Sequence, residues 1–492
     1  MSTFLPPEIL GNIFRRNVIP YGDFGGLVKG SYNFLLVCHH WSEVASRTPG
    51  LWCSWGNSIE DWGRRYARCG TGPLDLVLDT WVGRKLDDGL RDVPQDRAAR
   101  DVIRRVHVRG IHRAGLLNSV ISSIIVGGEG IRSNGMVSFI VENTSVGIIV
   151  DVSGFFSRYR LPKLQCLRLA GCRISSLDLL ESQTTALTTL ELIDHPLSPI
   201  TSTLSQLVSI LSSNPLLQDL SLSCDLVPHV VDGGRPAPLV PLRHLKTLSL
   251  SSDFRHTFLL MGQLELPDRL DSLDLSLHSC SPSDLSQTLG PYLRDRVRRW
   301  SGFPGGGLRL SATHDFSTFC FQIGDAKNRD SGWMVWFITV NAVMSRTLGG
   351  EVVEKIGSNL IARIPQRQVI SLRTNLPILR SEQLCIEMCN LTRLRLDEVD
   401  LSACFAELDI HEPHKFEKFL PSLDRIMLTR PTLGDGGWYP LTNFLSRRAA
   451  ARKPISSVRF YGYSNIGDDA YESISHAVKV FDLESSDIVG DY

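Results

Sequence analysis

The chain has 492 residues, of which 42% are hydrophobic and 21% charged, so it is long enough for two or more domains and too apolar to be disordered. Lys and Arg together number 52, as do Asp and Glu, and this balance argues against a protein that holds nucleic acid or anionic lipid by a general electrostatic field. No stretch approaches the roughly 18 apolar residues of a membrane span. We therefore expect no nucleic-acid partner and no membrane partner.

The eleven cysteines indicate a reducing compartment. Their number is odd, no Cys-x-x-Cys occurs, and most lie in or beside apolar runs, so the sequence predicts neither a disulfide framework nor a zinc ribbon. The N-terminus also lacks the basic segment and apolar core of a signal peptide. We expect an intracellular protein of the cytoplasm, the nucleus or both.

The first predicted elements are two short helices. Residues 5–14 read LPPEILGNIF, in which the prolines suit the first turn of a helix and apolar residues recur at i and i+4. Residues 37–45 read VCHHWSEVA, and their spacing predicts a second helix with a continuous apolar stripe. The stripe consists of Phe34, Val37, Cys38, Trp41 and Ala45. The PG pair at 49–50 ends this helix, and Leu51 and Trp52 follow as a second apolar anchor.

This stretch closely resembles an F-box. The matching elements are the opening Leu-Pro-x-Glu-Ile, the Ile-Phe one turn later, the Val-Cys-x-x-Trp of the second helix and the closing Leu-Trp. The connection at about 17–31 is longer and richer in glycine than in the family, which indicates an insertion. The resemblance implies an all-α domain over 1–56 that docks on the Skp-type adaptor of a cullin–RING ubiquitin ligase and, through it, on the cullin. The alternative is a helical hairpin packed on the next domain.

A module of this size carries more apolar side chains than its two helices can bury against each other. The surplus needs a partner surface or the next domain. At positions that match the family motif, the expected adaptor-binding residues are Leu5, Pro6, Ile9, Leu10, Ile13, Val37, Cys38, Trp41, Leu51 and Trp52. Some of them must fill the module's own core, and the sequence does not sort them.

Beyond a helical linker expected over 57–72, residues 73–78 alternate and predict a first strand. One spacing then recurs: an aliphatic residue, two others, an aliphatic, one other and an aliphatic. Seven copies begin at Ile103, Met136, Leu164, Leu187, Leu217, Leu245 and Leu270, and three more begin at Leu391, Leu423 and Ile455. We expect each copy to be a short strand whose alternate aliphatic residues are buried.

The recurring spacing resembles the strand signature of leucine-rich repeats, whose period is about 20–29 residues. The resemblance implies an irregular solenoid over 73–480 with a curved, mostly parallel sheet, because such repeats bury their apolar faces by stacking. The expected fold class is therefore α/β, an all-α F-box followed by this repeat domain. The alternative is a plain α/β domain with unrelated strands.

Three further segments have assignable patterns. Residues 203–211 predict a helix that the NP pair at 214–215 stops. The block 281–365 breaks the period, and we expect it to add a helix and further strands, including 319–323 and 333–340. Residues 468–480 predict an amphipathic helix that caps the stack, followed by a tail over 481–492.

The sequence shows no catalytic constellation, so we expect a protein that is not an enzyme and holds no cofactor and no metal. Residues 411–414 read HEPH, which has one residue too few between the histidines for a zinc-protease motif and a proline in the middle. The glycine-rich loops are not followed by Lys-Ser or Lys-Thr, so they predict turns and no phosphate loop. An enzyme within 281–365 is the remaining alternative of this class.

An F-box followed by leucine-rich repeats resembles the large F-box group of mushroom-forming fungi. The resemblance implies a substrate-recognition subunit of an SCF-type ligase, in which the repeat domain binds a target protein. The alternative is a non-catalytic scaffold that acts outside ubiquitination. Candidate target-binding residues are those between the strand leucines, which face away from the core: Arg168, Glu191, Ser221, Asp274, Arg395 and Arg459.

Overall fold

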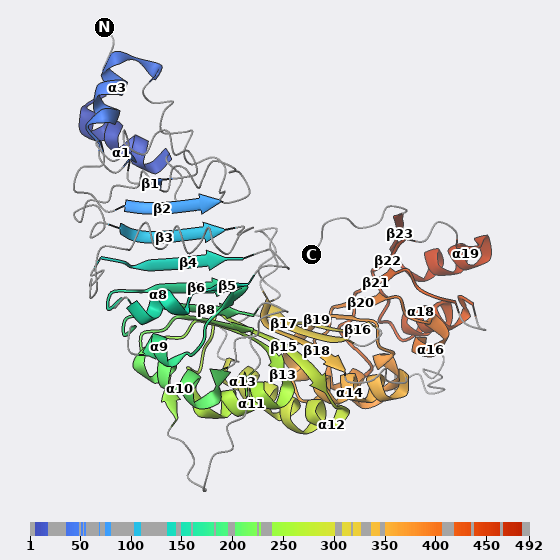
Figure 1. Ribbon diagram of the computed structural model, residues 1–492. Helices are drawn as coiled ribbons and strands as arrows, with labels where there is room; N and C mark the ends of the chain where they lie inside the picture. Colours follow the sequence, from blue (N-terminus) through green and yellow to red (C-terminus); the bar gives the residue numbers. More distant parts are fainter. Residues whose placement is uncertain are drawn as a thin grey trace, which may run out of the picture. The chain divides into compact units, whose positions relative to one another are not determined.

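The computed structural model is an α/β fold with a large, mostly parallel sheet that is not closed (Figure 1). It describes residues 5–17, 36–48, 51–52, 54–55, 68, 74–79, 103–109, 135–143, 149–158, 161–181, 184–194, 202–223, 226–227, 239–300, 308–315, 318–325, 336–344, 350–405, 418–433, 437–462 and 466–484. None of the helices in these ranges combines the length and apolar character needed to cross a bilayer.

The chain forms two compact units, and the first comprises residues 1–247 and 258–267. It opens with helices α1 (Pro7–Asn17) and α3 (His39–Ser46). Its main strands pair side by side in chain order, all of them parallel: β1 (Ser54–Trp55), β2 (Leu74–Asp79), β3 (Ile103–Arg109), β4 (Ser138–Glu142), β6 (Cys166–Ala170), β8 (Thr189–Ile193) and β10 (Asp219–Ser223).

Helices and short strands return the chain between these main strands. The helices are α8 (Ser153–Arg158), α9 (Asp178–Glu181) and α10 (Leu204–Ser213). Three two-stranded parallel ladders accompany them: β5 (Val150–Asp151) with β7 (Cys172–Arg173), β9 (Ser202–Thr203) with β11 (Leu226–Val227), and β12 (Val240–Pro241) with β14 (Leu264–Glu265). Helix α10 is the one predicted at 203–211, with Thr203 and Gln206 in a capping box and Asn214 at its end.

The second unit comprises residues 248–257 and 268–492, and the boundaries fall within β13 (Thr247–Asp253) and α11 (Phe254–Gln263). Its other strands are β15 (Ser272–Cys280), β16 (Leu308–Asp315), β17 (Thr318–Asp325), β18 (Trp336–Met344), β19 (Val369–Thr374), β20 (Arg393–Asp397), β21 (Arg425–Thr429), β22 (Ser457–Tyr461) and β23 (Val480–Glu484). Its helices are α12 (Pro282–Asp284), π-helical η5 (Leu285–Leu289), α13 (Gly290–Trp300), α14 (Gly350–Ala362), the 3-10 turns η6 (Gln366–Gln368) and η7 (Ile378–Arg380), α15 (Glu382–Glu387), α16 (Leu401–Phe405), α18 (Tyr439–Ala450) and α19 (Asp468–Ala477).

The spatial order of strands in the second unit is β15, β18, β17, β16, β19, β20, β21, β22, β23. Strand β17 runs antiparallel to both of its neighbours, and the other pairings are parallel. Two reversals of direction cancel, so β18 and β16 both run parallel to the strands that flank this three-stranded insertion. The sheet therefore continues through the irregular block 281–365, as expected.

The recurring aliphatic spacing marks strands throughout the chain. Each of the ten copies coincides with a strand: β3, β4, β6, β8, β10, β13, β15, β20, β21 and β22. The middle and last aliphatic residues of each copy are buried, as Leu167 and Leu169 of β6 are, while the residues between them are less buried. Burial of alternate leucines in one layer is thus the physical cause of the strand register.

Two expectations about the ends of elements are wrong. Helix α3 begins at His39, and Cys38 before it has extended backbone (φ −163°, ψ 169°), so the predicted stripe from Phe34 is not one continuous helix. The tail expected from 481 begins later, because Val480–Glu484 forms β23 and pairs with β22. The helical linker expected over 57–72 lies almost wholly outside the described residues, as do positions 18–31 of the expected insertion.

A left-handed residue follows several strands at an equivalent place. Gly171 (φ 66°) follows β6, Glu398 (φ 53°) follows β20, Arg430 (φ 46°) follows β21 and Gly462 (φ 69°) follows β22. In the first three, the backbone N–H donates to the last residue of the next strand, for example from Glu398 to the Thr429 carbonyl (2.7 Å). The same left-handed turn thus ends these four strands.

Candidate functional site

The two N-terminal helices enclose a small apolar core. The rings of Phe14 and Trp41 meet edge to face with centroids 5.1 Å apart, and Leu10 is buried. Trp52 is fully buried, and its Nε1–H donates to the Ala45 carbonyl at 2.8 Å. Leu51 is buried beside it in the chain. Leu10, Leu51 and Trp52, all expected to contact an adaptor, are therefore core residues that hold the helices together.

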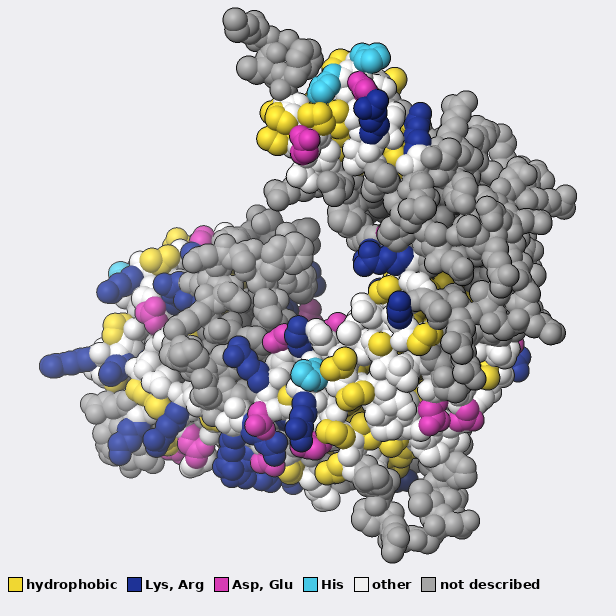
Figure 2. Space-filling view, turned by 90° about the vertical axis from the view of Figure 1, so that its left-hand side faces the viewer, with side chains coloured by type: hydrophobic (Ala, Val, Ile, Leu, Met, Phe, Trp, Pro, Cys, Tyr) yellow, Lys and Arg dark blue, Asp and Glu magenta, His cyan; other side chains and the backbone are white. Residues whose placement is uncertain are grey.

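The remaining expected docking residues lie at the surface of this segment. Ile9 is 48% exposed and Val37 56% exposed, and Leu5, Pro6 and Cys38 are also exposed. Leu36, which the sequence did not single out, is 82% exposed. Ile13 and Trp41 are partly buried. Figure 2 shows hydrophobic side chains gathered with histidines over this part of the chain.

One polar contact fixes the start of α1 against α3. The Nε2–H of His40 donates to the Leu5 carbonyl at 3.3 Å, and the backbone N–H of Leu10 donates to the Pro6 carbonyl at 3.0 Å. The first of these bonds links the chain before α1 to α3. We call Leu5, Pro6, Ile9, Leu36, Val37 and Cys38 the N-terminal apolar surface. Such a surface can bind a partner by burial of apolar area.

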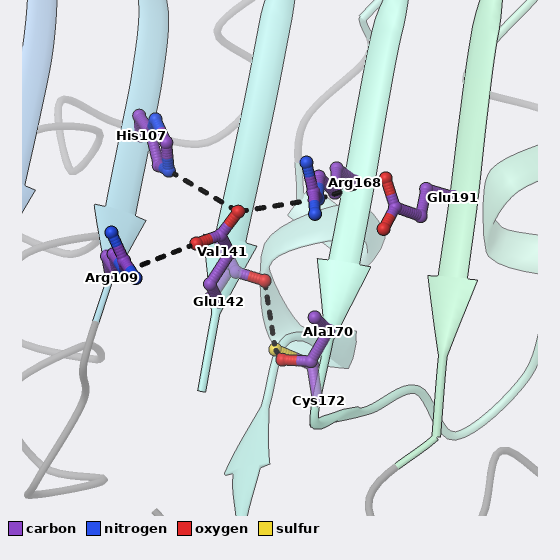
Figure 3. A network of polar contacts seen from close by, with 8 residues as sticks. All are labelled: His107, Arg109, Val141, Glu142, Arg168, Ala170, Cys172 and Glu191. Atoms are coloured by element: carbon purple, nitrogen blue, oxygen red, sulfur yellow. Dashed lines mark hydrogen bonds and ion pairs between the residues drawn. The ribbon is translucent and has the colours of Figure 1, made fainter. Parts of the chain in front are cut away.

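The polar face of the first unit carries a network of charges centred on Glu142 (Figure 3). Its carboxylate lies 3.8 Å from Nε2 of His107, 3.6 Å from Nε of Arg109 and 3.4 Å from Nε of Arg168. Arg168 also lies 2.9 Å from the carboxylate of Glu191. These residues come from β3, β4, β6 and β8, so the parallel register brings them together.

Burial shifts the acidity of two members of this network. It lowers the pKa of His107, although the nearby carboxylate of Glu142 acts in the opposite direction. It raises the pKa of Glu191, although Arg168 opposes that shift. Both shifts have one cause, because burial favours the neutral form of the imidazole and of the carboxyl group. The network is thus a cluster of ion pairs with half-exposed arginines at its rim.

A second network lies on the polar face of the second unit and is centred on Asp397. The Nε–H of Arg395 donates to its carboxylate at 2.8 Å, and the Nε–H of Arg373 donates to its other oxygen. Burial acts to raise the pKa of Asp397, but the hydrogen bonds from Arg395 and Arg373 outweigh it, so the pKa lies below its usual value. All three side chains are mostly buried.

The six residues expected to bind a target form two rows of the sheet. Arg168, Glu191 and Ser221 are register neighbours in the first unit. Asp274, Arg395 and Arg459 lie in one row of the second unit that crosses all nine strands from β15 to β23. Arg168, Glu191, Arg395 and Arg459 are engaged in ion pairs within the sheet.

Sequence reasoning missed the central carboxylates of both networks. Glu142 and Asp397 each stand directly after the last aliphatic residue of a repeat, Val141 and Leu396. This shared position could have identified both residues. A side chain there lies on the polar face of the sheet, next to the residue that stands between the two buried aliphatic residues of the next repeat.

Metal-binding groups and two buried thiols can be assessed among the described residues. Among them no group of three His, Cys, Asp or Glu side chains is placed to hold a metal ion. Burial raises the pKa of the Cys172 and Cys280 thiols to about 12, so neither is a thiolate at neutral pH. The HEPH sequence at 411–414 lies outside the described part of the chain.

Comparison with known proteins leaves the chain without a family assignment. No family model matches the sequence, and no curated protein matches it.

Proposed function

We propose that this protein is a substrate-recognition subunit of a cullin–RING ubiquitin ligase of the SCF type. In this proposal residues 1–56 are an F-box that docks on a Skp-type adaptor, and the strands from β2 onward are irregular leucine-rich repeats that hold a target protein. The catalytic cysteine belongs to another subunit. The role of this chain is to raise the effective concentration of a target lysine near the ubiquitin thioester.

The observation that supports the proposal is the division of apolar residues in the N-terminal segment. Leu10, Phe14, Val44 and Trp52 are buried and account for the segment's own core. The N-terminal apolar surface remains exposed in the presence of the whole chain, although it contains large aliphatic side chains. Contiguous exposed apolar residues of this kind are typical of protein-binding sites.

Adaptor binding by the full-length protein tests the proposal. In pull-down and titration with a purified Skp-type adaptor, we expect the double variant Ile9→Asp/Val37→Asp to bind at least about 100-fold more weakly, because two desolvated apolar contacts are replaced by charges. The matched control is Leu216→Asp, which alters a 52% exposed leucine between α10 and β10 and should bind as the wild type does. Unchanged thermal melting of all three proteins excludes unfolding as the cause.

Equal adaptor affinity of the double variant and the control would contradict docking through this surface. Co-purification from cells distinguishes the two proposed functions that both require adaptor binding. Recovery of adaptor together with cullin supports a ligase subunit, and recovery of adaptor without cullin supports a scaffold outside ubiquitination.

A further inference from the structure

Strand β23 is the last strand of the sheet in the second unit (Figure 1). It pairs with β22 along its whole length, from Ser457 opposite Val480 to Tyr461 opposite Glu484. Among the described residues the register pairs of β23 are with β22, and no strand is in register with its other side. An open edge of this kind presents backbone donors and acceptors to which a further strand can bind.

The hydrogen bonds of β23 show which of its groups face outward. The Val480 N–H donates to the Ser456 carbonyl at 2.9 Å, so Val480 points its backbone groups toward β22. Successive residues of a strand point their N–H and C=O groups to opposite sides, so Asp482 also faces β22. The N–H and C=O groups of Phe481 and Leu483 therefore face the open edge.

The apolar layer of the sheet also continues to this edge without being covered. Leu483 is the register partner of Phe460, and Phe481 is the partner of Val458. Phe460 and Val458 are fully buried, whereas Leu483 is 36% exposed. The rings of Phe481 and Tyr471 meet at 4.9 Å, and Tyr471 is exposed as well. An added strand would bury these side chains as β23 buries those of β22.

The charge at this edge indicates what such a strand must carry. Asp482 lies 3.9 Å from Arg459 of β22, and both side chains are about half exposed. Elsewhere in the sheet, Glu142 lies between cations on both flanking strands, Arg109 on β3 and Arg168 on β6. Asp482 has a cation on the β22 side, and a Lys or Arg on an added strand would complete the same arrangement. A second copy of β23 would instead bring a second acidic strand.

We propose that an extended segment of a partner protein, in which Lys or Arg alternates with aliphatic residues, binds beside β23 as an additional strand. Its backbone pairs with Phe481 and Leu483, its aliphatic residues cover Leu483 and Tyr471, and its basic residues lie beside Asp482. This site goes beyond the proposed adaptor docking, which uses the N-terminal apolar surface, so either proposal can fail alone.

The test uses the full-length protein and two fluorescein-labelled nine-residue peptides, one alternating Lys with Val and one with Glu in place of every Lys. In anisotropy titrations we expect the Lys peptide to bind and the Glu peptide to bind at least tenfold more weakly. Leu483→Pro removes an outward N–H while leaving the ladder to β22 intact, and it should weaken the Lys peptide at least tenfold. The matched variant Leu483→Ala keeps that N–H and should lose only a few-fold.

Two further measurements keep the proposal falsifiable if Leu483→Pro does not fold. Asp482→Lys should reverse the preference, so that the Glu peptide binds more tightly than the Lys peptide. In the wild type, hydrogen exchange at single-residue resolution should slow at Phe481 and Leu483 when the Lys peptide is added. Absence of binding, equal binding to wild type and Leu483→Pro, or protection elsewhere in the chain would overturn the proposal. Adaptor pull-down should be unaffected by each of these variants.

Discussion

Glu142 at the end of β4 and Asp397 at the end of β20 occupy the same position of the repeat but are held differently. Glu142 lies between cations of two flanking strands at 3.4–3.8 Å, and the arginines there are half exposed. Asp397 accepts hydrogen bonds from Arg395 of its own strand and from Arg373 of β19, and these arginines are mostly buried. We expect the stabilisation by such a carboxylate to depend on how deeply its arginine partners are buried and on the geometry of their hydrogen bonds. The number of neighbouring charges should matter less.

The turns after the strands differ between the same two regions. Gly171 follows β6, and a Cβ added there would lie 2.4 Å from the Asn143 carbonyl oxygen. The Asn143 amide also donates to the Gly171 carbonyl at 2.9 Å, so the two turns are tied together. After β20 the equivalent residue is Glu398, which carries a full side chain at a similar φ. The left-handed conformation is thus shared, and the requirement for glycine is local.

The largest effect is expected for Gly171→Ala. The added methyl group meets backbone as well as the cost of the left-handed conformation, so we expect the free energy of unfolding to fall by about 2–4 kcal/mol. Gly437→Ala is the matched control, because Gly437 has φ 56° but nothing lies within 4 Å of its added Cβ. It should cost only about 1 kcal/mol. Urea denaturation of both variants measures the difference, and equal losses would contradict the close approach.

A smaller difference is expected between the two carboxylates. Asp397→Ala should lower the free energy of unfolding by about 2–3 kcal/mol, because it removes a charged acceptor from two mostly buried arginines. Glu142→Ala should cost about 1 kcal/mol or less, because Arg109 and Arg168 can turn to water. Chemical denaturation at pH 7 compares them, and a larger loss for Glu142→Ala would invert the ranking drawn above.

The smallest effect is a pH dependence that distinguishes the two networks. The pKa of His107 lies below its ordinary value of 6.5 in the folded protein, so the unfolded chain takes up the proton first and stability falls as the pH drops below about 6.5. The pKa of Asp397 lies below its ordinary 3.8, so its stabilisation is lost only as the pH falls below about 4.

We therefore expect the melting temperature of His107→Gln to change less between pH 7 and pH 5 than that of the wild type. The melting temperature of Asp397→Ala should change with pH as that of the wild type does between pH 7 and pH 5. The two proteins should differ in their pH dependence only in stronger acid. A wild-type slope in His107→Gln would show that another group controls the response.

The spacing of leucines predicted most of the strands because each strand buries one face in a continuous layer. Strand β19 was not predicted, because its last buried position holds Thr374 and not an aliphatic residue. The Thr374 hydroxyl accepts a hydrogen bond from the Leu376 N–H at 3.0 Å. Strand β23 was not predicted, because its pattern begins with an exposed valine at the open edge.

The candidate sites were less predictable than the strands. Apolar residues of short helices look alike in sequence whether they face the core, as Leu10 does, or the solvent, as Ile9 does. Helix α3 begins at His39, one residue after Cys38. Val37 therefore lies outside the helix, although the apolar periodicity had placed it on the same helical stripe as Trp41. Partners of a charge such as Arg168 lie on other strands, so the pairing depends on register that only the folded sheet supplies.

The three-stranded insertion has a consequence for the order of assembly. Neighbouring strands β20 and β21 join residues 32 positions apart, such as Leu394 and Ile426, whereas β15 and β18 join residues 65 apart, such as Leu273 and Ile338. The antiparallel pair β16–β17 closes over two residues, between Asp315 and Thr318. Closing a short loop costs less chain entropy than closing a long one, so this hairpin can form locally and early. The hairpin is then joined to β15 through β18 and to β19 through β16, which pairs residues 62 apart such as Leu310 and Leu372. We expect these two long-range pairings to form later than the pairings between neighbouring repeats.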